Sequence, residues 1–382
     1  MKIPFHKAEL SNEEINAASD VIRSGWLTMG EKTFEFERDF SKYTGASNSI
    51  AVNSCTAALH LALKAADIKA GDEVIIPAMT FIATWEVITY SGAVPVLCDV
   101  LKDNFLIDPL EIEKRITPKT KALIPVHYGG ESCDMDRIMD IARKHKLIVI
   151  EDAAHALPTL YKERMVGTIG DITCFSFYAT KTLTTGEGGM ITTENPAWAD
   201  RMKRLRLHGI TKDAWNRYSD KGSWEYDVSE AGYKYNITDI ASAIGVEQLK
   251  KSNEMNLARR KIADRYNSAF SKSGLLDLWK VRNDVECAWH LYPVKLMTDK
   301  LKINRNEFIL ELKNRDIGTS VHYIPMYRFS VFKDSGYTPN DFPGCEDIFS
   351  REVSLPIFPW MTDSEIDYVI ENVLEVLEKN RR

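Results

Sequence analysis

The sequence predicts an α/β protein, with a mainly parallel central sheet in residues 1–250 and a smaller α+β domain in residues 251–382. Short apolar runs alternate with helical stretches, which is typical of parallel strands joined by helices. These runs lack polar alternation, so both faces of the sheet are expected to be covered. The alternation weakens after about residue 250, and 382 residues are too many for one ordinary core.

The first expected helix begins at Ser11. Ser11 and Glu14 have the spacing of a capping box, and Ile15, Val21 and Ile22 would form the apolar face that follows. From about position 50, strands are expected at 49–53, 73–76, 94–100, 122–126, 147–150, 172–177 and 190–193. The helices expected between them cover 56–66, 83–90 and 135–145.

The C-terminal part has a weaker pattern. Residues 250–270 predict a long charged helix that connects the two domains. A strand at 290–296, a helix at 305–315 and a strand at 319–323 would follow. The last helix is expected from Asp363 to about Lys379, because Thr362 and Glu365 form a capping box. Its apolar face would be made of Ile366, Val369, Ile370, Val373, Leu374 and Leu377.

Composition excludes several classes of protein. Apolar residues make up 44% and charged residues 27%, the balance of a globular chain. A net charge of −6 gives no global reason to expect nucleic acid or an anionic membrane as partner. The six cysteines form no C-x-x-C pair, which argues against a zinc site and a disulfide framework. Without a signal peptide or a long apolar span, we expect a soluble cytoplasmic protein with no metal.

Parallel sheets bind ligands at the carboxyl ends of their strands. That rule locates the expected site after Asn53, after Pro77, after Val126 and around residues 151–155. His127 lies at the end of one expected strand. It would contact residues of the site and not the ligand itself. These segments are far apart in the chain, and the topology of the sheet would bring them together.

Residues 150–193 carry the chemistry. Asp152 follows an apolar strand, and Lys181 lies in a polar loop after the strand that contains Ser176. An enzyme that uses pyridoxal 5′-phosphate (PLP) needs a lysine for a Schiff base and a carboxylate that keeps the pyridine nitrogen protonated. It also needs hydrogen-bond donors to the cofactor's phosphate, preferably at a helix N-terminus. Ser54 and Thr56 could lie at the start of such a helix. The sequence therefore favours a PLP site.

This stretch resembles the DegT/DnrJ/EryC1/StrS family of PLP-dependent aminotransferases of nucleotide-linked sugars. Motifs in the same order support the likeness: NSCTAAL at 53–59, PAMTFIAT at 77–84, GYKYNITD at 232–239 and SLPIFPWMT at 354–362. The resemblance covers nearly the whole chain. It implies the aspartate aminotransferase type of fold, also called PLP fold type I.

The resemblance also implies roles for single residues. Lys181 would hold the cofactor and carry the proton, and Asp152 would pair with the pyridinium nitrogen. His155 would approach the 3-hydroxyl of the ring, and Phe81 would stack on it. The phosphate would be bound by Thr56, Ala57 and Ser176, and by Asn236 of the neighbouring subunit, which makes a homodimer with shared sites necessary. Possible substrate contacts are His208, His322 and Tyr323.

Structural interpretations of these residues remain open. His155 could make a structural hydrogen bond, Phe81 could belong to the core, and Ser176 could bond the backbone. Trp85 is better explained by packing, and Gly186 to Gly189 by a tight turn. The substrate contacts could equally be satisfied interior polar groups. Cys55 stands where many relatives carry glycine, so a side chain would narrow the phosphate loop.

The resemblance implies transfer of an amino group from an amino acid, L-glutamate, to a nucleotide-diphosphate keto-sugar, with pyridoxamine 5′-phosphate (PMP) formed in between. The loop from Thr184 to Gly189, TTGEGG, is similar to that of relatives that aminate carbon 4, which favours a 4-keto-6-deoxy sugar over a 3-keto one. Two alternatives remain: a PLP-dependent dehydratase or lyase, and a PLP-binding regulator without catalysis. Lysine at 181, where the dehydratases carry histidine, favours transamination.

Overall fold

A computed structural model describes residues 1–8, 10–211 and 225–382. Within these residues the largest sheet has seven strands in the order β1-β9-β8-β5-β4-β2-β3. Only β9 runs against its neighbours, so this described sheet is mainly parallel as expected. Its strands are β1 (Asn48–Val52), β2 (Glu73–Pro77), β3 (Val94–Cys98), β4 (Thr120–Leu123), β5 (Ile148–Asp152), β8 (Ile172–Ser176) and β9 (Gly189–Thr193).

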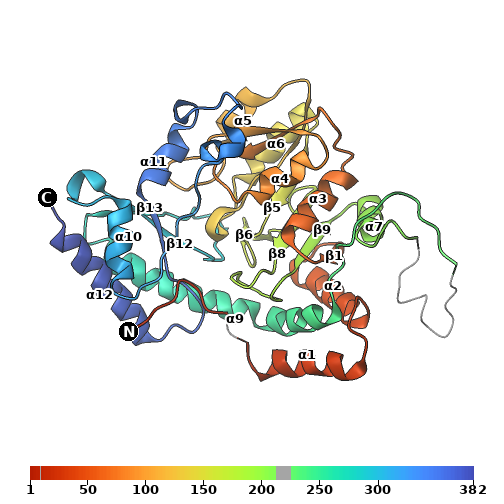
Figure 1. Ribbon diagram of the computed structural model, residues 1–382, viewed down its shortest axis with the longest axis horizontal. Helices are drawn as coiled ribbons and strands as arrows, with labels where there is room; N and C mark the ends of the chain where they lie inside the picture. The colour runs from red at the N-terminus through yellow and green to blue at the C-terminus, as the bar shows by residue number, and fades with distance from the viewer. Residues whose placement is uncertain (9, 212–224) are drawn as a thin grey trace.

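Helices cover this sheet (Figure 1). The central strands β5, β8 and β9 are almost entirely buried, as a parallel sheet between helical layers requires. α3 packs against α4 and α7, and α5 packs against α6. The helices of this part are α2 (Glu31–Thr44), α3 (Cys55–Ala65), α4 (Ala83–Thr89), α5 (Pro109–Arg115), α6 (Met135–His145) and α7 (Pro196–Leu205).

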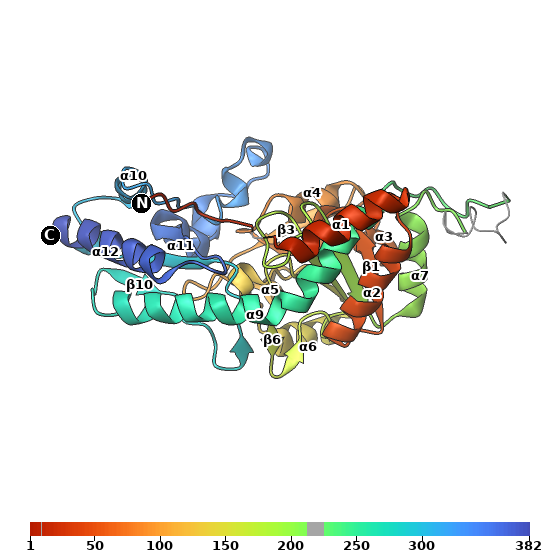
Figure 2. The ribbon, with the colours of Figure 1, turned by 90° about the horizontal axis from the view of Figure 1, so that it is seen from below.

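A 32-residue helix, α9 (Asp239–Phe270), runs along the molecule beneath both of its halves (Figure 2). The expected connecting helix at 250–270 is therefore only the second half of a longer helix. α1 (Asn12–Ser24) and α2 pack against its first part, and α12 (Asp363–Lys379) packs against it farther along. The boundary expected after residue 250 falls inside α9, and the division into two domains stays a proposal.

The C-terminal part forms a second sheet, ordered β10-β12-β13, whose neighbouring strands are antiparallel. Its elements are β10 (Leu276–Leu278), β12 (Tyr292–Leu296), α10 (Arg305–Lys313), α11 (Pro343–Arg351), β13 (Glu352–Leu355) and α12. A third small sheet pairs β11 (Val285–Glu286) with the hairpin β6 (Leu160–Tyr161) and β7 (Arg164–Met165). Strand pairing thus ties the two parts of the chain together.

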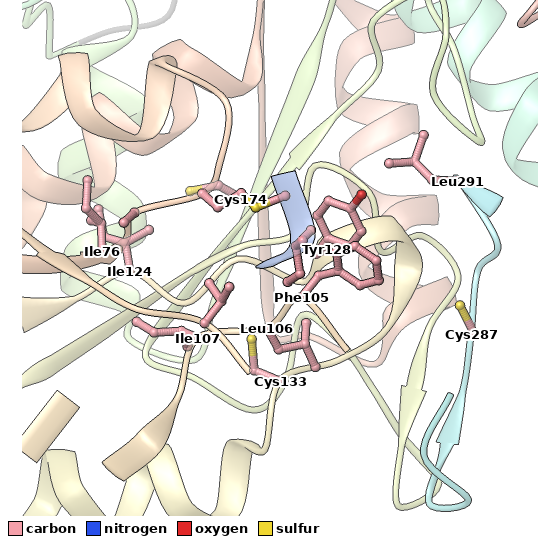
Figure 3. Close-up of a cluster of buried hydrophobic side chains, with 14 of the residues drawn as sticks. Ile76, Phe105, Leu106, Ile107, Ile124, Tyr128, Cys133, Cys174, Cys287 and Leu291 are labelled. Atoms are coloured by element: carbon pink, nitrogen blue, oxygen red, sulfur yellow. The ribbon is translucent and has the colours of Figure 1, made fainter. Parts of the chain in front are cut away.

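One buried apolar cluster extends through both parts, from Ile50 of the large sheet to Val373 of the last helix. Near its middle, the rings of Phe105 and Tyr128 stack with centroids 4.7 Å apart (Figure 3). Trp279 meets both rings edge-on. This continuous packing gives the loops between the two parts a rigid base.

Two expectations about the elements are wrong. Residues 319–323 do not form a strand; Ser320 makes only an isolated bridge to Ser354 of β13. On α1 the capping box is present, yet Ile15 and Ile22 are 55% and 58% exposed and only Val21 of the expected face is buried. None of the described helices is long and apolar enough to cross a membrane.

Candidate active site

A cavity of about 440 Å³ opens where the carboxyl ends of the parallel strands meet the C-terminal part. Every segment predicted to meet there contributes to it: residues after β1, after β2, after β4, and at the ends of β5 and β8. The edge of the sheet at which a ligand was expected therefore forms part of the wall of the cavity. Among the expected site residues, the lining includes Thr56, Phe81, Asp152, His155, Ser176, Lys181, His322 and Tyr323.

Asp152 is the last residue of β5, and the residue is 5% exposed. Oδ1 accepts a hydrogen bond from the Ala154 amide at 3.1 Å, and Oδ2 accepts one from the Thr84 hydroxyl at 3.0 Å. Burial raises the pKa of Asp152, against the opposing effects of these two donors and of Lys181. Among the described residues no cation bonds this carboxylate, so it has room for a positively charged partner in the cavity.

Lys181 lies in the loop that follows β8, and it lines the same cavity. Its amide donates to the carbonyl of Tyr178, which shapes the loop into a turn. Burial lowers the pKa of the Lys181 amine to about 8, while Cys55 and Asp152 act to raise it. A lysine with such a pKa has an appreciable neutral fraction near neutral pH and can act as a nucleophile or a proton carrier.

The start of α3 lies in the wall of the cavity. Ser54 caps the helix: its hydroxyl accepts the Ala57 amide at 3.1 Å. The amide of Ala57 is therefore already engaged, and Ala57 does not line the cavity. Cys55 and Thr56, the first two residues of the helix, do line it, and amides in a first helical turn are free to bind anions. Ser176 lies nearby at the end of β8.

His155 and Tyr323 form a bonded pair in the wall. The Gly129 amide donates to Nδ1 of His155 at 3.2 Å, and Nε2 lies 3.0 Å from the Tyr323 hydroxyl. Burial holds the pKa of His155 well below its usual value, so the ring is neutral. Because Nδ1 accepts a hydrogen bond, the neutral ring carries its proton on Nε2, which donates a hydrogen bond to the Tyr323 hydroxyl.

Phe81 is 59% exposed, so it is not a core residue, which was its structural alternative. Its ring lines the cavity with its centroid 6.2 Å from that of Tyr323. Trp85 instead packs against Phe332 at 5.1 Å, as its packing interpretation predicts.

Besides Ala57, two expected residues are absent from the lining of this cavity. Asn236 is 9% exposed, and its Nδ2 donates to the Ile237 carbonyl while Oδ1 has no partner among the described residues. His208 is exposed in a turn with a φ of 61° and bonds the Tyr233 carbonyl through its backbone. His127, in turn, lies under the site, with Nε2 2.8 Å from Glu151.

The structure adds residues that sequence reasoning did not identify. His6 and His290 line the cavity from the N-terminal segment and the C-terminal part, and His290 stands 4.4 Å from His155 between ring centroids. Burial lowers the pKa of His6 to about 4 and that of His290 well below normal. No local pattern marks either residue. Thr84 could have been predicted as a site residue, because it ends the PAMTFIAT motif, at the start of a helix that follows a strand.

These residues fit a PLP group. An uncompensated buried carboxylate suits a ring that carries its own N–H⁺, and the amine of Lys181 lines the same cavity. The first turn of α3 suits a phosphate, and the exposed face of Phe81 suits an aromatic ring.

Comparison with known proteins gives an independent result. Residues 8–374 match the model of the DegT/DnrJ/EryC1/StrS aminotransferase family. The chain is 47% identical over 378 residues to the spore coat polysaccharide biosynthesis protein SpsC of Bacillus subtilis, covering 98% of this chain and 97% of SpsC. It is 50% identical over 380 residues to the uncharacterized protein MJ1066 of Methanocaldococcus jannaschii, covering 99% and 98%.

Among solved structures, the chain is similar to the putative sugar aminotransferase Spr1654 from Streptococcus pneumoniae. Its PMP-form superposes with a TM-score of 0.93 at 38% identity and covers 99% of this chain and 100% of that one. A PLP-form of the same protein superposes equally well, at 37% identity and 99% coverage of each chain. The fold is therefore that of the type I PLP aminotransferases.

Proposed function

We propose that this chain, which belongs to the DegT/DnrJ/EryC1/StrS aminotransferase family and is a PLP-dependent sugar aminotransferase, aminates a nucleotide-diphosphate keto-sugar with L-glutamate as donor. The observation that carries the proposal is that Lys181, whose pKa burial lowers to about 8, lines the same cavity as the buried carboxyl group of Asp152. The cofactor, when bound, stores the amino group between the two halves of the reaction.

The side chains would divide the work by position. Asp152 would hold the pyridine nitrogen in its protonated form, and Thr84 would keep that carboxylate oriented. The first turn of α3, with Thr56 and Ser176, would bind the phosphate. Phe81 would cover the ring and limit the access of water from its exposed side. His155 would reach the 3-hydroxyl.

Lys181 would hold the cofactor covalently and act as the proton carrier once its amine is released. The lowered pKa supports this second role, because a group that gives and takes protons works best with a pKa near the working pH. In the first half-reaction the amine would carry a proton from the donor's α-carbon to the cofactor, and in the second it would carry a proton from the cofactor to the sugar carbon.

The identity of the sugar rests on two supports. SpsC carries a name that refers to spore coat polysaccharide biosynthesis, which suits an amino sugar for a surface polysaccharide. The TTGEGG loop places Glu187 and Gly188 in the cavity wall, where it could set how deeply a sugar ring enters. With the resemblance of this loop to that of carbon-4 enzymes, we propose a 4-keto-6-deoxy sugar.

We also propose a homodimer with shared sites. Asn236 lies away from its own cavity and has an amide oxygen without a partner among the described residues, which suits a role at the phosphate of the neighbouring subunit. Two aromatic residues on the cavity wall, Phe81 and Tyr178, are 59% and 47% exposed and would be covered by a second subunit.

The test offers matched 3-keto and 4-keto nucleotide sugars to the purified enzyme with L-glutamate and follows the products by mass spectrometry. We expect the 4-keto sugar to gain an amino group, with an equal amount of 2-oxoglutarate. A preference for the 3-keto sugar would overturn the position but not the transamination. Sugar that loses water without forming keto acid would instead indicate a dehydratase, and PLP binding without any turnover a regulator.

The cofactor itself is tested by absorbance. We expect the wild type to absorb near the visible edge and to bleach when glutamate is added, and Lys181→Ala to lack this band. A wild type that binds no PLP would overturn the proposed function.

A further inference from the structure

Three hydrogen-bonded side chains lead from a buried carboxyl group to the cavity. Ser354 donates from Oγ to Oε1 of Glu352 at 2.6 Å, and Oγ lies 2.9 Å from Nδ1 of His322. Glu352 and Ser354 are fully buried in β13, whereas His322 lines the cavity. We propose that Glu352, Ser354 and His322 form a proton relay, in which Nε2 of His322 gives a proton to a bound ligand, or takes one from it, while the imidazole stays neutral.

The geometry fixes the order of the three groups. The segment that contains His322 lies beside β13, where the backbones of Ser320 and Ser354 exchange hydrogen bonds. The His322 amide donates to Oε2 of Glu352 at 3.0 Å, so the backbone itself holds the carboxyl group in line. Nε2 of His322 makes no hydrogen bond within the described residues, and it is the ring atom on the side away from Nδ1.

A serine between a carboxyl group and an imidazole can point its proton either way. With Glu352 ionised, Ser354 donates to Glu352, Nδ1 of His322 donates to Ser354, and Nε2 is an acceptor. With Glu352 protonated, both of these side-chain hydrogen bonds reverse and Nε2 becomes a donor. In either state His322 is uncharged, which agrees with the burial that lowers its pKa to about 3, with Lys181 acting in the same direction.

The surroundings of Glu352 favour a carboxyl group that holds a proton near neutral pH and can release it. Burial raises the pKa of Glu352 to about 8, while Ser354, the His322 amide and Arg305 of α10 act to lower it. Opposite Glu352 on β12, Lys295 pairs with Asp277 at 2.9 Å instead. Two phenols lie near this group: the Tyr128 hydroxyl donates to the His322 carbonyl at 2.8 Å, and Tyr323 lines the cavity. Burial raises the pKa of both, so these phenols stay neutral.

The relay depends on the proposed function in one respect: amino transfer is the reaction whose protons it would carry. A ketone oxygen takes up protons as it leaves as water, and an amino-acid donor arrives as an ammonium and gives protons up. In the first case Nε2 gives a proton to the oxygen, Ser354 gives its proton to Nδ1, and Glu352 gives its proton to Ser354. The donor's proton restores Glu352 by the reverse order, so protons balance and no electrons move.

The test measures the tautomer of His322 directly in the holoenzyme. Long-range ¹H–¹⁵N spectra of ¹⁵N-histidine-labelled protein separate the two neutral tautomers, and the signals of His322 are those lost in His322→Gln. We expect the proton to sit on Nε2 below pH 8 and on Nδ1 above it. Glu352→Gln and Ser354→Ala should each abolish this pH dependence, and the control Ser320→Ala should retain it.

Kinetics give the second measurement. We expect Ser354→Ala and Glu352→Gln to lower kcat about 10²-fold with little change in KM. Ser320→Ala should keep both. The relay is overturned if His322 keeps one tautomer from pH 6 to 9.5, or if it titrates to an imidazolium in this range. Should Ser354→Ala fail to fold, Glu352→Gln decides. A tautomer switch without sugar turnover would keep the relay and reject the proposed function.

Discussion

The Thr84 hydroxyl donates a 3.0 Å hydrogen bond to Oδ2 of Asp152, across 68 residues of sequence. Thr84 is fully buried in the first turn of α4, and Asp152 closes β5. Two strands that share one sheet edge thus bring the residues after them into contact, and the carboxylate is fixed in one orientation before any ligand binds.

Replacing Thr84 by valine should therefore weaken the site through Asp152. Loss of a hydrogen bond to a charged group costs about 1.5–3 kcal/mol, which should appear in the free energy of unfolding. The pKa of Asp152 would rise further, so we also expect several-fold weaker PLP binding, measured by absorbance titration. Thr84→Ser keeps the hydroxyl and is the control. Equal PLP affinity in the valine variant and the wild type would contradict this role.

The lowered pKa of Lys181 predicts how fast the cofactor is captured. Only the neutral amine reacts with an aldehyde, so the rate at which protein stripped of cofactor takes up PLP should rise with pH and level off above about 8. Stopped-flow absorbance would record this rate between pH 6.5 and 9.5. A rate still rising at pH 9.5 would show that the amine keeps its ordinary pKa. Lys181→Arg should bind PLP without the absorbance band.

Shared sites predict complementation between two inactive variants. In a dimer of Asn236→Ala with Lys181→Ala, one site contains both Lys181 and the partner's Asn236, while the other contains neither. Random mixing would make half of the dimers hybrid, so about a quarter of the wild-type activity should return. The measurement is activity after unfolding and refolding the mixed chains. If no activity returns although hybrids form, Asn236 serves its own subunit.

The last helix allows a test of local stability away from the cavity. Thr362 accepts the Glu365 amide at 3.2 Å, and Glu365 accepts the Thr362 amide at 2.8 Å. Thr362→Ala should lower the free energy of unfolding by about 1 kcal/mol, and Thr362→Ser should restore most of it. Urea denaturation measures the loss. The PLP absorbance should not change, and if it did, α12 would be coupled to the site.

Local signals explain which elements could be predicted. Helices α6 and α12 have the predicted bounds, Met135–His145 and Asp363–Lys379, because caps and apolar periodicity lie within each segment. The prediction of a strand at 319–323 is wrong. The residue pattern of this segment does not reveal that it meets β13 only at an isolated bridge. The exposed Ile15 on α1 shows the same limit: periodicity marks an apolar face, but not what covers it.

By itself the sequence predicted the mainly parallel sheet, the edge of the sheet at which the cavity lies, and Asp152 and Lys181 as residues of its wall. These could be predicted because alternating strands and helices and a family motif can be read along the chain. Only the tertiary structure brought Thr84 to Asp152, His6 and His290 to the cavity, and Glu352 to His322 through Ser354. The reason is physical: hydrogen bonds and burial depend on distances between segments that no local pattern encodes. The pKa shifts that suit Lys181 and Glu352 to proton transfer arise mainly from that burial.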